Sequence, residues 1–341
     1  MLKKAKQAVL RGARALGAFQ TLSQSQWRRN RLLILCYHSL SLDEEHFWRP
    51  PLFFRQEDLE RRMRLLRKLG CTILPFQEAV DLTVKKALPP LSVAITFDDG
   101  THDFYKLAAP VLSSLSIPAT VYVTSYYSEA GKPIFHLMCH YLLWKGRQRT
   151  LGVDAELGVL SPIVLSTESA RRAAYETITG FARSRRLTAD EKDAIAGRLA
   201  AALGLDYSFL LEKRVLRIMT PGEVGQVAKA GFDVQLHTHR HRTPRDKDLF
   251  LREIRDNREW IQKCTGSVPR HFCYPSGVYY PEFLPWLRRE GVQTATTCVP
   301  RLVTAQTELL LLPRLVDTCS LSDVEFEAWI AGAAALLPAR S

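Results

Sequence analysis

The 341-residue chain lacks the paired cysteines of a disulfide framework. Its seven cysteines are scattered singly, with no C-x-x-C spacing, which favours free thiols in a reducing compartment. No run of about 18 apolar residues occurs, so we expect no spanning helix. The glycines show no phosphate-loop spacing, and nucleotide binding therefore has no support. With 46% hydrophobic and 24% charged residues, the composition is that of a globular protein, which we expect in the cytoplasm.

Acidic residues are missing from the first 42 positions, which hold eight of the basic residues behind the formal net charge of +12. We expect a basic amphipathic helix over residues 1–30, and such a helix can lie on an anionic membrane surface. A solvated helix, or one that docks on the core, fits equally well, so peripheral contact with the inner membrane surface stays open. The charge is not interleaved with aromatic residues, so we expect no nucleic-acid partner. At 100° per residue, five apolar residues fall on one side of this helix: Leu2, Ala5, Val9, Ala13 and Leu16.

Two adjacent carboxylates close an unbroken apolar segment at Thr96-Phe97-Asp98-Asp99-Gly100. Buried parallel strands read as continuous apolar runs, and α/β proteins place their chemistry where such strands end. Neighbouring acids at that place repel each other unless a cation or a proton offsets them. Asp-Asp-Gly is also good turn chemistry, so this segment alone does not decide between a site and a turn.

Three histidines occur within five residues at His237-Thr238-His239-Arg240-His241, after a second apolar run. Protonated histidines at alternate positions beside an arginine would repel each other, whereas a divalent metal binds the neutral imidazole. Two imidazoles and a carboxylate with open positions are typical of a catalytic zinc site. We therefore favour a metal site over a basic surface loop.

The two segments in this order resemble the first two motifs of the polysaccharide deacetylases, carbohydrate esterase family four. The resemblance implies that Asp99, His237 and His241 bind the metal, with Zn²⁺ as the expected ion, and that Asp98 is the catalytic base. The segment Leu35-Cys36-Tyr37-His38-Ser39 is similar to one found in a branch of the family. With one large interruption, the resemblance runs from about residue 32 to about residue 316.

The third family motif is altered at His271-Phe272-Cys273-Tyr274-Pro275-Ser276-Gly277. Cys273 stands where the family has an arginine that holds the catalytic aspartate, so another cation must hold Asp98. Arg240, Arg270 and Arg314 are the candidates for this cation. Ser276 stands where a backbone amide forms the oxyanion hole in the family, and any residue in the right turn can supply that amide. We also place His102, Tyr274 and Arg314 among the substrate-binding residues.

The family's closing Leu-x-His is missing, because no histidine follows His271. Amide cleavage needs an acid to protonate the leaving amine. Asp98 can shuttle the proton in both directions, and this is the reading that we favour. His239, His271 and Asp317 are the alternative acids. A further possibility is that the missing acid has cost the protein its activity.

Short apolar runs alternate with helical stretches along most of the chain, which predicts a parallel sheet and, with this many repeats, a (β/α) barrel. We expect a distorted barrel of the polysaccharide deacetylase type over residues 31–341. The alternation lapses over about residues 126–218, which we interpret as a mainly helical insertion that acts as a substrate lid. The predicted strands are 32–37, 72–74, 93–97, 119–124, 232–236, 271–274, 294–298 and 309–316.

Together these features predict a metal-dependent hydrolase that removes an N-acyl group, most simply acetyl, from an amino sugar. The substrate is a polysaccharide or glycan precursor, and a lipid-linked one if residues 1–30 bind membrane. Two alternatives remain open. One is hydrolysis of another non-peptide carbon–nitrogen bond, in a formamide or a cyclic amide. The other is a non-catalytic glycan-binding barrel.

Overall fold

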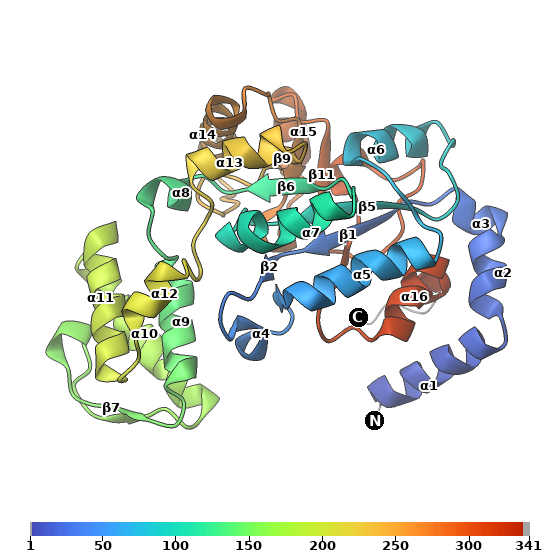
Figure 1. Cartoon of the computed structure of the whole chain (residues 1–341). Coiled ribbons are helices and arrows are strands. Elements are labelled where there is room, and N and C mark those ends of the chain that lie inside the picture. Colours follow the sequence, from blue (N-terminus) through green and yellow to red (C-terminus); the bar gives the residue numbers. More distant parts are fainter. Residues whose placement is uncertain (1, 337–341) are drawn as a thin grey trace.

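The computed structural model describes residues 2–336, in which a curled parallel sheet carries helices on its outer side (Figure 1). The strand order is β11-β10-β9-β6-β5-β1-β12, with β4 paired to β5, and every pairing in this sheet is parallel. The strands are β1 Leu33–Tyr37, β4 Thr72–Ile73, β5 Ser92–Phe97, β6 Thr120–Val123, β9 Asp233–Leu236, β10 His271–Cys273, β11 Thr294–Thr296 and β12 Leu315–Val316.

The sheet closes into a distorted barrel through the residues just before β12. The Leu312 amide donates to the Ala295 carbonyl and the Thr297 amide donates to the Leu312 carbonyl, both at 2.8 Å, while β12 pairs with β1 on its other side. The predicted (β/α) barrel is therefore confirmed. The expected strand 309–316 is wrong in its first half, because Leu309–Leu311 forms a 3₁₀ helix capped by the Glu308 side chain.

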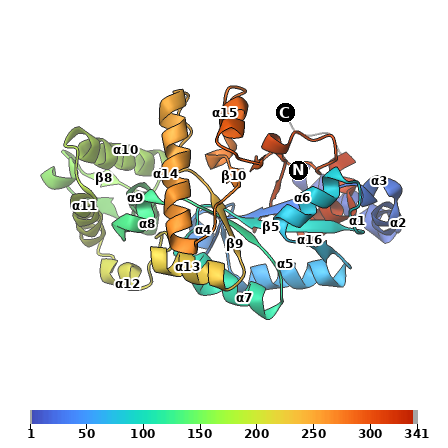
Figure 2. The same cartoon turned by 90° about the horizontal axis from the view of Figure 1, so that it is seen from above.

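Amphipathic helices cover the outer face of the sheet, seen from above in Figure 2. The apolar sides of all of them except α6 pack on the strands in one continuous core, whereas those of α6 form a separate cluster with Ile34 and Ala94. Capping boxes at Thr220 and Ser322 begin two of them. The outer helices are α5 Gln56–Lys68, α6 Phe76–Val84, α7 Ala109–Ser114, α13 Pro221–Lys229, α14 Lys247–Thr265, α15 Phe283–Arg289 and α16 Asp323–Ala331.

Residues 126–218 form a group of helices beside the barrel, on the left of Figure 1, with a second hydrophobic core. That core also takes in Phe53 and, at its edge, Leu42, Trp48 and Leu52 from the segment between β1 and α5. The insertion is thus packed against the barrel rather than tethered to it. Its elements are α8 Tyr126–Ala130, α9 Phe135–Lys145, β7 Thr150–Leu151, β8 Ile163–Val164, α10 Glu168–Ser184, α11 Ala189–Ala202 and α12 Tyr207–Glu212.

The stretch that leaves the insertion is hydrogen-bonded to the segment that follows Asp99. Thr101 and Ile218 form an antiparallel bridge. The Met219 amide donates to the Gly100 carbonyl at 3.0 Å, and the His102 amide donates to the Arg217 carbonyl at 2.8 Å. The backbone after the paired aspartates therefore has the insertion as its neighbour.

The amino terminus forms three short helices instead of one, so the single helix expected over residues 1–30 is wrong. They are α1 Leu2–Ala15, α2 Ala18–Gln24 and α3 Gln26–Arg29. Gly17, at a left-handed φ of 76°, separates the first two, and Ser25 separates the second from the third by capping α3. Met1 lies outside the described residues.

Helix α1 docks on α16 through Leu10, and of the apolar stripe expected from the sequence Ala13 packs at this contact while Val9 and Leu16 do not. Leu10 and Phe19 are buried against Val324 and Ala328. Lys6 and Arg14 face Glu325 and Glu327 at 3.8 and 3.0 Å, and these pairs fix which side faces α16. Val9 and Leu16 of the expected stripe remain 67% and 88% exposed. Among residues 2–336 no helix has the length and apolar character needed to cross a bilayer.

Candidate active site

The carboxyl ends of four strands of the sheet bring the chemical groups of the sequence motifs to one edge of the barrel. Strand β5 leads into Asp98 and Asp99, β9 into His237, and β1 into His38, while Cys273 ends β10. Parallel strands end at a common edge, which is where α/β proteins place their sites. Residues as far apart in the sequence as His38 and Cys273 therefore meet here.

Asp99, His237 and His241 converge on one another. Their ligand atoms all lie within 4.8 Å of one another. The Nε2 atoms of His237 and His241 lie 3.1 and 3.2 Å from the same oxygen, Asp99 Oδ1. The structure thus brings together the three residues that the sequence predicts as metal ligands.

The orientation of His237 leaves a coordinating nitrogen pointing at Asp99. Its Nδ1 lies 2.9 Å from the Cys273 carbonyl oxygen, which can only accept, so Nδ1 carries the proton. In the neutral ring Nε2 then has a lone pair, and it faces a carboxylate oxygen that is also an acceptor. Two acceptors at this distance need a proton or a cation between them. A backbone carbonyl that fixes the tautomer in this way is usual behind metal-binding histidines.

The charges at this place act strongly on one another. Burial alone would raise the pKa of Asp99, but His241 and His237 beside it lower that pKa well below its usual range. Burial would lower the pKa of His237, yet the hydrogen bond to Asp99 and the charge of Asp98 raise it. The carboxylate is therefore held charged, and two imidazoles compete for it. A carboxylate oxygen and two imidazole nitrogens form a donor set that fits a divalent ion such as Zn²⁺.

The loop that carries the histidines is held by two buried residues of α14. The Asn257 side-chain oxygen accepts from the His237 amide at 2.9 Å. Glu253, only 1% exposed, accepts from the Arg240 amide and from Arg242 Nε, both at 2.7 Å. The sequence carries no signal for these two supports, because they lie mid-helix and far along the chain.

Strained backbone is concentrated in these loops. Asp99, Thr238, His241 and Ser276 have φ values of 70°, 64°, 53° and 56°. Non-glycine residues adopt this left-handed region at an energetic cost, and such residues cluster at functional sites. Gly100 is required at its position, because a Cβ there would lie 2.6 Å from Val123 Cγ1.

Asp98 lies behind the three-residue group and is held by Arg314. The guanidinium makes two parallel contacts, Nη1 to Oδ1 and Nη2 to Oδ2, both at 2.7 Å. Burial would raise the pKa of Asp98, but Arg314 lowers it below its usual value. Asp98 is therefore charged at neutral pH. Of the three cations that the sequence left open, only Arg314 contacts it among the described residues.

Arg314 is fully buried, so the expectation that it touches substrate is replaced by a positioning role. Arg314 directly precedes β12, and its Nη2 also lies 3.0 Å from the sulfur of Cys273, the residue that stands in place of the motif arginine. The thiols of Cys36 and Cys273 each donate to Asp98 Oδ2 at 3.4 Å. Burial raises the pKa of both thiols, which keeps them as neutral donors.

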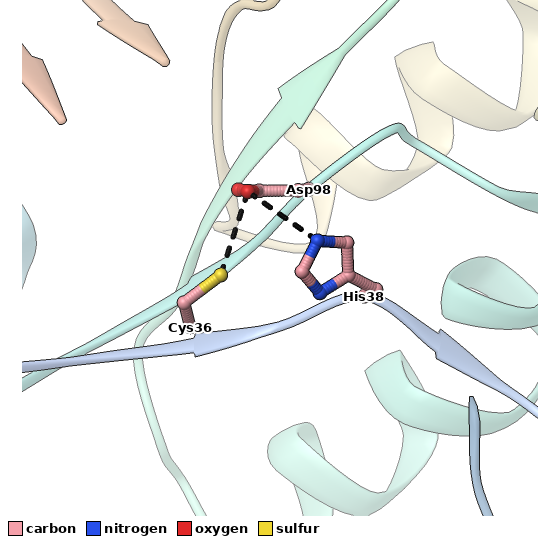
Figure 3. A group of neighbouring side chains, drawn as sticks. All are labelled: Cys36, His38 and Asp98. Atoms are coloured by element: carbon pink, nitrogen blue, oxygen red, sulfur yellow. Dashed lines mark hydrogen bonds and ion pairs between the residues drawn. The ribbon is translucent and has the colours of Figure 1, made fainter. Parts of the chain in front are cut away.

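His38 is the site residue that the sequence motifs did not single out. Figure 3 shows it with Cys36, both directed at Asp98 from the end of β1. Its Nε2 lies 4.0 Å from Asp98 Oδ2, and its side chain is 18% exposed. The usable signal was its place directly after an apolar strand, in Leu35-Cys36-Tyr37-His38-Ser39.

The three side chains weighed against Asp98 as the acid lie elsewhere. His239 faces Ser125, with Nδ1 2.9 Å from its hydroxyl oxygen. His271 begins β10, at the opposite edge of the barrel, and bonds Thr294. Asp317 is buried against Arg62 and Tyr37. No described contact joins any of them to Asp98 or Asp99.

The remaining predicted residues occupy different positions. Ser276 lies in the exposed turn Pro275–Gly277 directly after β10. His102 is buried with Nδ1 3.2 Å from Glu223, and Tyr274 is fully buried with its hydroxyl on the Leu310 carbonyl. The structure therefore does not bring His102 and Tyr274 to the Asp98–Asp99 group, because core and ion-pair contacts take up their side chains.

The fold and this edge define a class: a (β/α) barrel with a candidate metal centre and an adjacent buried carboxylate. The sequence model described as polysaccharide deacetylase matches residues 85–141 and 196–295, which contain Asp98, Asp99, His237 and His241. The chain is 34% identical over 107 residues to YxkH of Bacillus subtilis (strain 168), a protein assigned by name to the polysaccharide deacetylases. The two matched segments, which carry the candidate site, are therefore assigned to a polysaccharide deacetylase domain. That alignment covers 31% of the chain and about a third (34%) of the relative.

Solved structures share the fold. The Streptococcus pyogenes deacetylase PplD, in complex with acetate, matches with a TM-score of 0.59 and 17% identity over 90% of this chain and 99% of that one. A de-N-acetylase from Aggregatibacter actinomycetemcomitans matches with a TM-score of 0.56 and 13% identity, over 88% of this chain and 99% of that one. IcaB from Ammonifex degensii matches with a TM-score of 0.54 and 18% identity, over 88% of this chain and 97% of that one. At these identities the likeness concerns the fold.

Proposed function

We propose that this protein is a metal-dependent N-deacetylase that acts on an amino sugar of a polysaccharide or glycan precursor. The observation that carries the proposal is the meeting of Asp99, His237 and His241 beside a charged, buried Asp98. The match to a polysaccharide deacetylase domain supports deacetylation of a polysaccharide. Asp99, His237 and His241 would hold the ion, with Zn²⁺ as the proposed species.

Asp98 is the proposed general base. A divalent ion, when bound, would polarise the acetamide carbonyl and lower the pKa of a water molecule. Asp98 takes the proton from the attacking water, because Arg314 keeps it charged and fixes its orientation. The amide of Ser276, in the exposed turn after β10, is the proposed donor to the oxyanion.

His38 is the proposed general acid, in place of the shuttling by Asp98 that the sequence favoured. It reaches the catalytic carboxylate from the partly open side, and among the described histidines it lies nearest to Asp98 without belonging to the proposed ligand set. A protonated imidazole can give the proton that the leaving amine needs. Asp98 and His38 then divide the base and acid roles.

Release of acetate tests the function. The full chain should release acetate from N-acetylated amino-sugar oligomers, lose that activity after chelation, and regain it on addition of Zn²⁺. Metal content per chain is measured alongside. Formate release from N-formyl sugars, ring opening of a cyclic amide, or binding of the oligomer without any product would point to the alternative functions instead.

Replacing His38 by Gln should lower kcat on an N-acetyl sugar by about 10²–10⁴-fold, the usual contribution of a general acid. With 4-nitrophenyl acetate the loss should be small, because nitrophenolate leaves without a proton. Asp98→Asn serves as the comparison, since removing the base should slow both substrates. Equal losses of His38→Gln on amide and ester would assign His38 a structural role.

Lipid linkage of the substrate and membrane contact of the amino terminus also belong to the proposal. Val9 and Leu16 point outward from α1, and Arg11 on the same helix is exposed. Vesicles rich in phosphatidylglycerol should co-sediment with the chain, and the double change Val9→Glu and Leu16→Glu should abolish this. The paired outward substitutions Ala8→Glu and Ala15→Glu are the charge-matched control. If both double variants lose vesicle binding equally, the loss is due to the added negative charge alone. If the wild type does not co-sediment with the vesicles, membrane contact is excluded.

A further inference from the structure

A cavity of about 120 Å³ opens in the insertion, between α8, α11 and α12. Its apolar walls come from Tyr126, Tyr127, Phe135 and Tyr207, and its polar groups include Lys132 and Asp193. Tyr126 and Tyr127 stand edge to face, 5.3 Å between ring centres. An apolar hollow with a few converging polar groups has the general character of a small-molecule site.

The cavity adjoins the candidate active site. The Tyr126 amide donates to the His239 carbonyl at 2.8 Å, and Arg240 lies over the Tyr126 ring at 5.4 Å. Tyr126 therefore contacts the loop that carries His237 and His241.

A second hollow, lined by Ile134, Leu137, His38 and Asp99, lies on the other side of the start of α9. Phe135 and Met138 on that helix line the first cavity. Only the width of a helix, about 10 Å, separates the two.

The polar groups of the cavity are already oriented. Asp193 accepts from the Tyr207 hydroxyl at 2.6 Å and pairs with Lys132 Nζ at 3.3 Å. Its side chain keeps 16% exposure, so it can take a further hydroxyl donor. Flat aromatic walls suit the C–H faces of a pyranose, and a carboxylate with an ammonium suits its hydroxyls. A cavity of about 150 Å³ takes benzene, so 120 Å³ with an open side is enough for part of one ring.

We infer that this cavity is a subsite for a further sugar of the glycan, beyond the sugar that is deacetylated. The inference rests on the proposed function and narrows its substrate to an oligomer. The subsite makes the enzyme prefer an oligosaccharide over a single N-acetyl sugar. The insertion then selects substrate length, while the barrel carries the chemistry.

Filling the cavity tests the subsite without removing a buried contact. Ala189, at the start of α11, lines the cavity, and Ala194 is exposed on the same helix outside that lining. Ala189→Trp should weaken binding of the β-1,4-linked N-acetylglucosamine tetramer about tenfold by calorimetry, and raise its KM similarly with kcat unchanged. Binding and turnover of the monomer should stay the same. Ala194→Trp should behave as the wild type.

Tetramer binding that Ala189→Trp leaves unchanged would overturn the subsite, and so would a wild type that binds tetramer no better than monomer. Equal effects of Ala189→Trp and Ala194→Trp would do the same. If the protein binds the tetramer and Ala189→Trp weakens that binding, but no acetate is released, the subsite proposal stands and the deacetylase proposal is refuted. Acetate release with no dependence on length or on Ala189 would retain the deacetylase and refute the subsite.

Discussion

Asp98→Asn should lower kcat for acetate release by about 10²–10⁴-fold while zinc content stays at the wild-type level. The loss follows because an amide cannot take the proton of water, and Asp98 is the buried carboxylate held charged beside the ligand group. Zinc content should not change, because the proposed ligands are Asp99, His237 and His241. Single-turnover release of acetate and elemental analysis of the purified variant measure the two effects.

Asp103→Asn is the matched control. Asp103 is another buried carboxyl group five positions along, and burial raises its pKa to about 8, so it is largely protonated at pH 7. Its oxygen accepts from the Leu40 amide at 2.7 Å, a bond that an asparagine can keep. This variant should retain activity within a few fold. An Asp98→Asn enzyme with wild-type turnover would show that another group is the base.

Arg314→Met should destabilise the protein by about 3–5 kcal/mol, the usual cost of leaving one partner of a buried ion pair alone. Arg314 and Asp98 are buried and contact each other through two bonds of 2.7 Å. Without the guanidinium, burial should raise the pKa of Asp98. Because the base must be deprotonated, the acid limb of kcat/KM should move to higher pH. Urea unfolding and a pH–rate profile measure both effects.

The double variant Asp98→Asn with Arg314→Met separates charge from packing. Removing both charges should restore much of the stability lost in Arg314→Met, because no uncompensated carboxylate remains buried. Arg314→Lys keeps a positive charge but loses the planar fork that matches the carboxylate, so it should fall between the wild type and Arg314→Met. A double variant as unstable as the single one would mean that Arg314 acts through its packing alone.

The strand ends could be predicted from the sequence because the barrel strands are short apolar runs followed by polar residues. That pattern located Asp98, Asp99 and His237, and their convergence follows from parallel strands ending at one edge. His241 was assigned because His237–His241 resembles the second family motif. Helix starts are encoded just as locally, because Thr188, Thr220 and Ser322 each form a capping box with a glutamate three residues on.

The partners of Asp98 could not be predicted in the same way. Arg314 lies between a proline and the last strand, Leu315–Val316, and has no local signal that separates it from Arg240 or Arg270. Its role depends on barrel closure, which brings β12 next to β1 and thus near β5. Similarly, α1 offered two usable sides, and acids of α16, more than 300 residues away, decided which one docked. Sequence periodicity describes a helix and does not identify its neighbour.

The backbone bonds between Arg217–Met219 and Gly100–His102 have a practical consequence for anyone who exchanges parts between relatives. The insertion cannot be exchanged as an independent unit, because its last residues are hydrogen-bonded to the turn that follows Asp99. A graft that ends before Arg217 keeps these backbone hydrogen bonds and can still change the cavity. One that runs through Met219 would alter the carboxylate's backbone along with the glycan contacts, and the two effects could not be told apart in the assay.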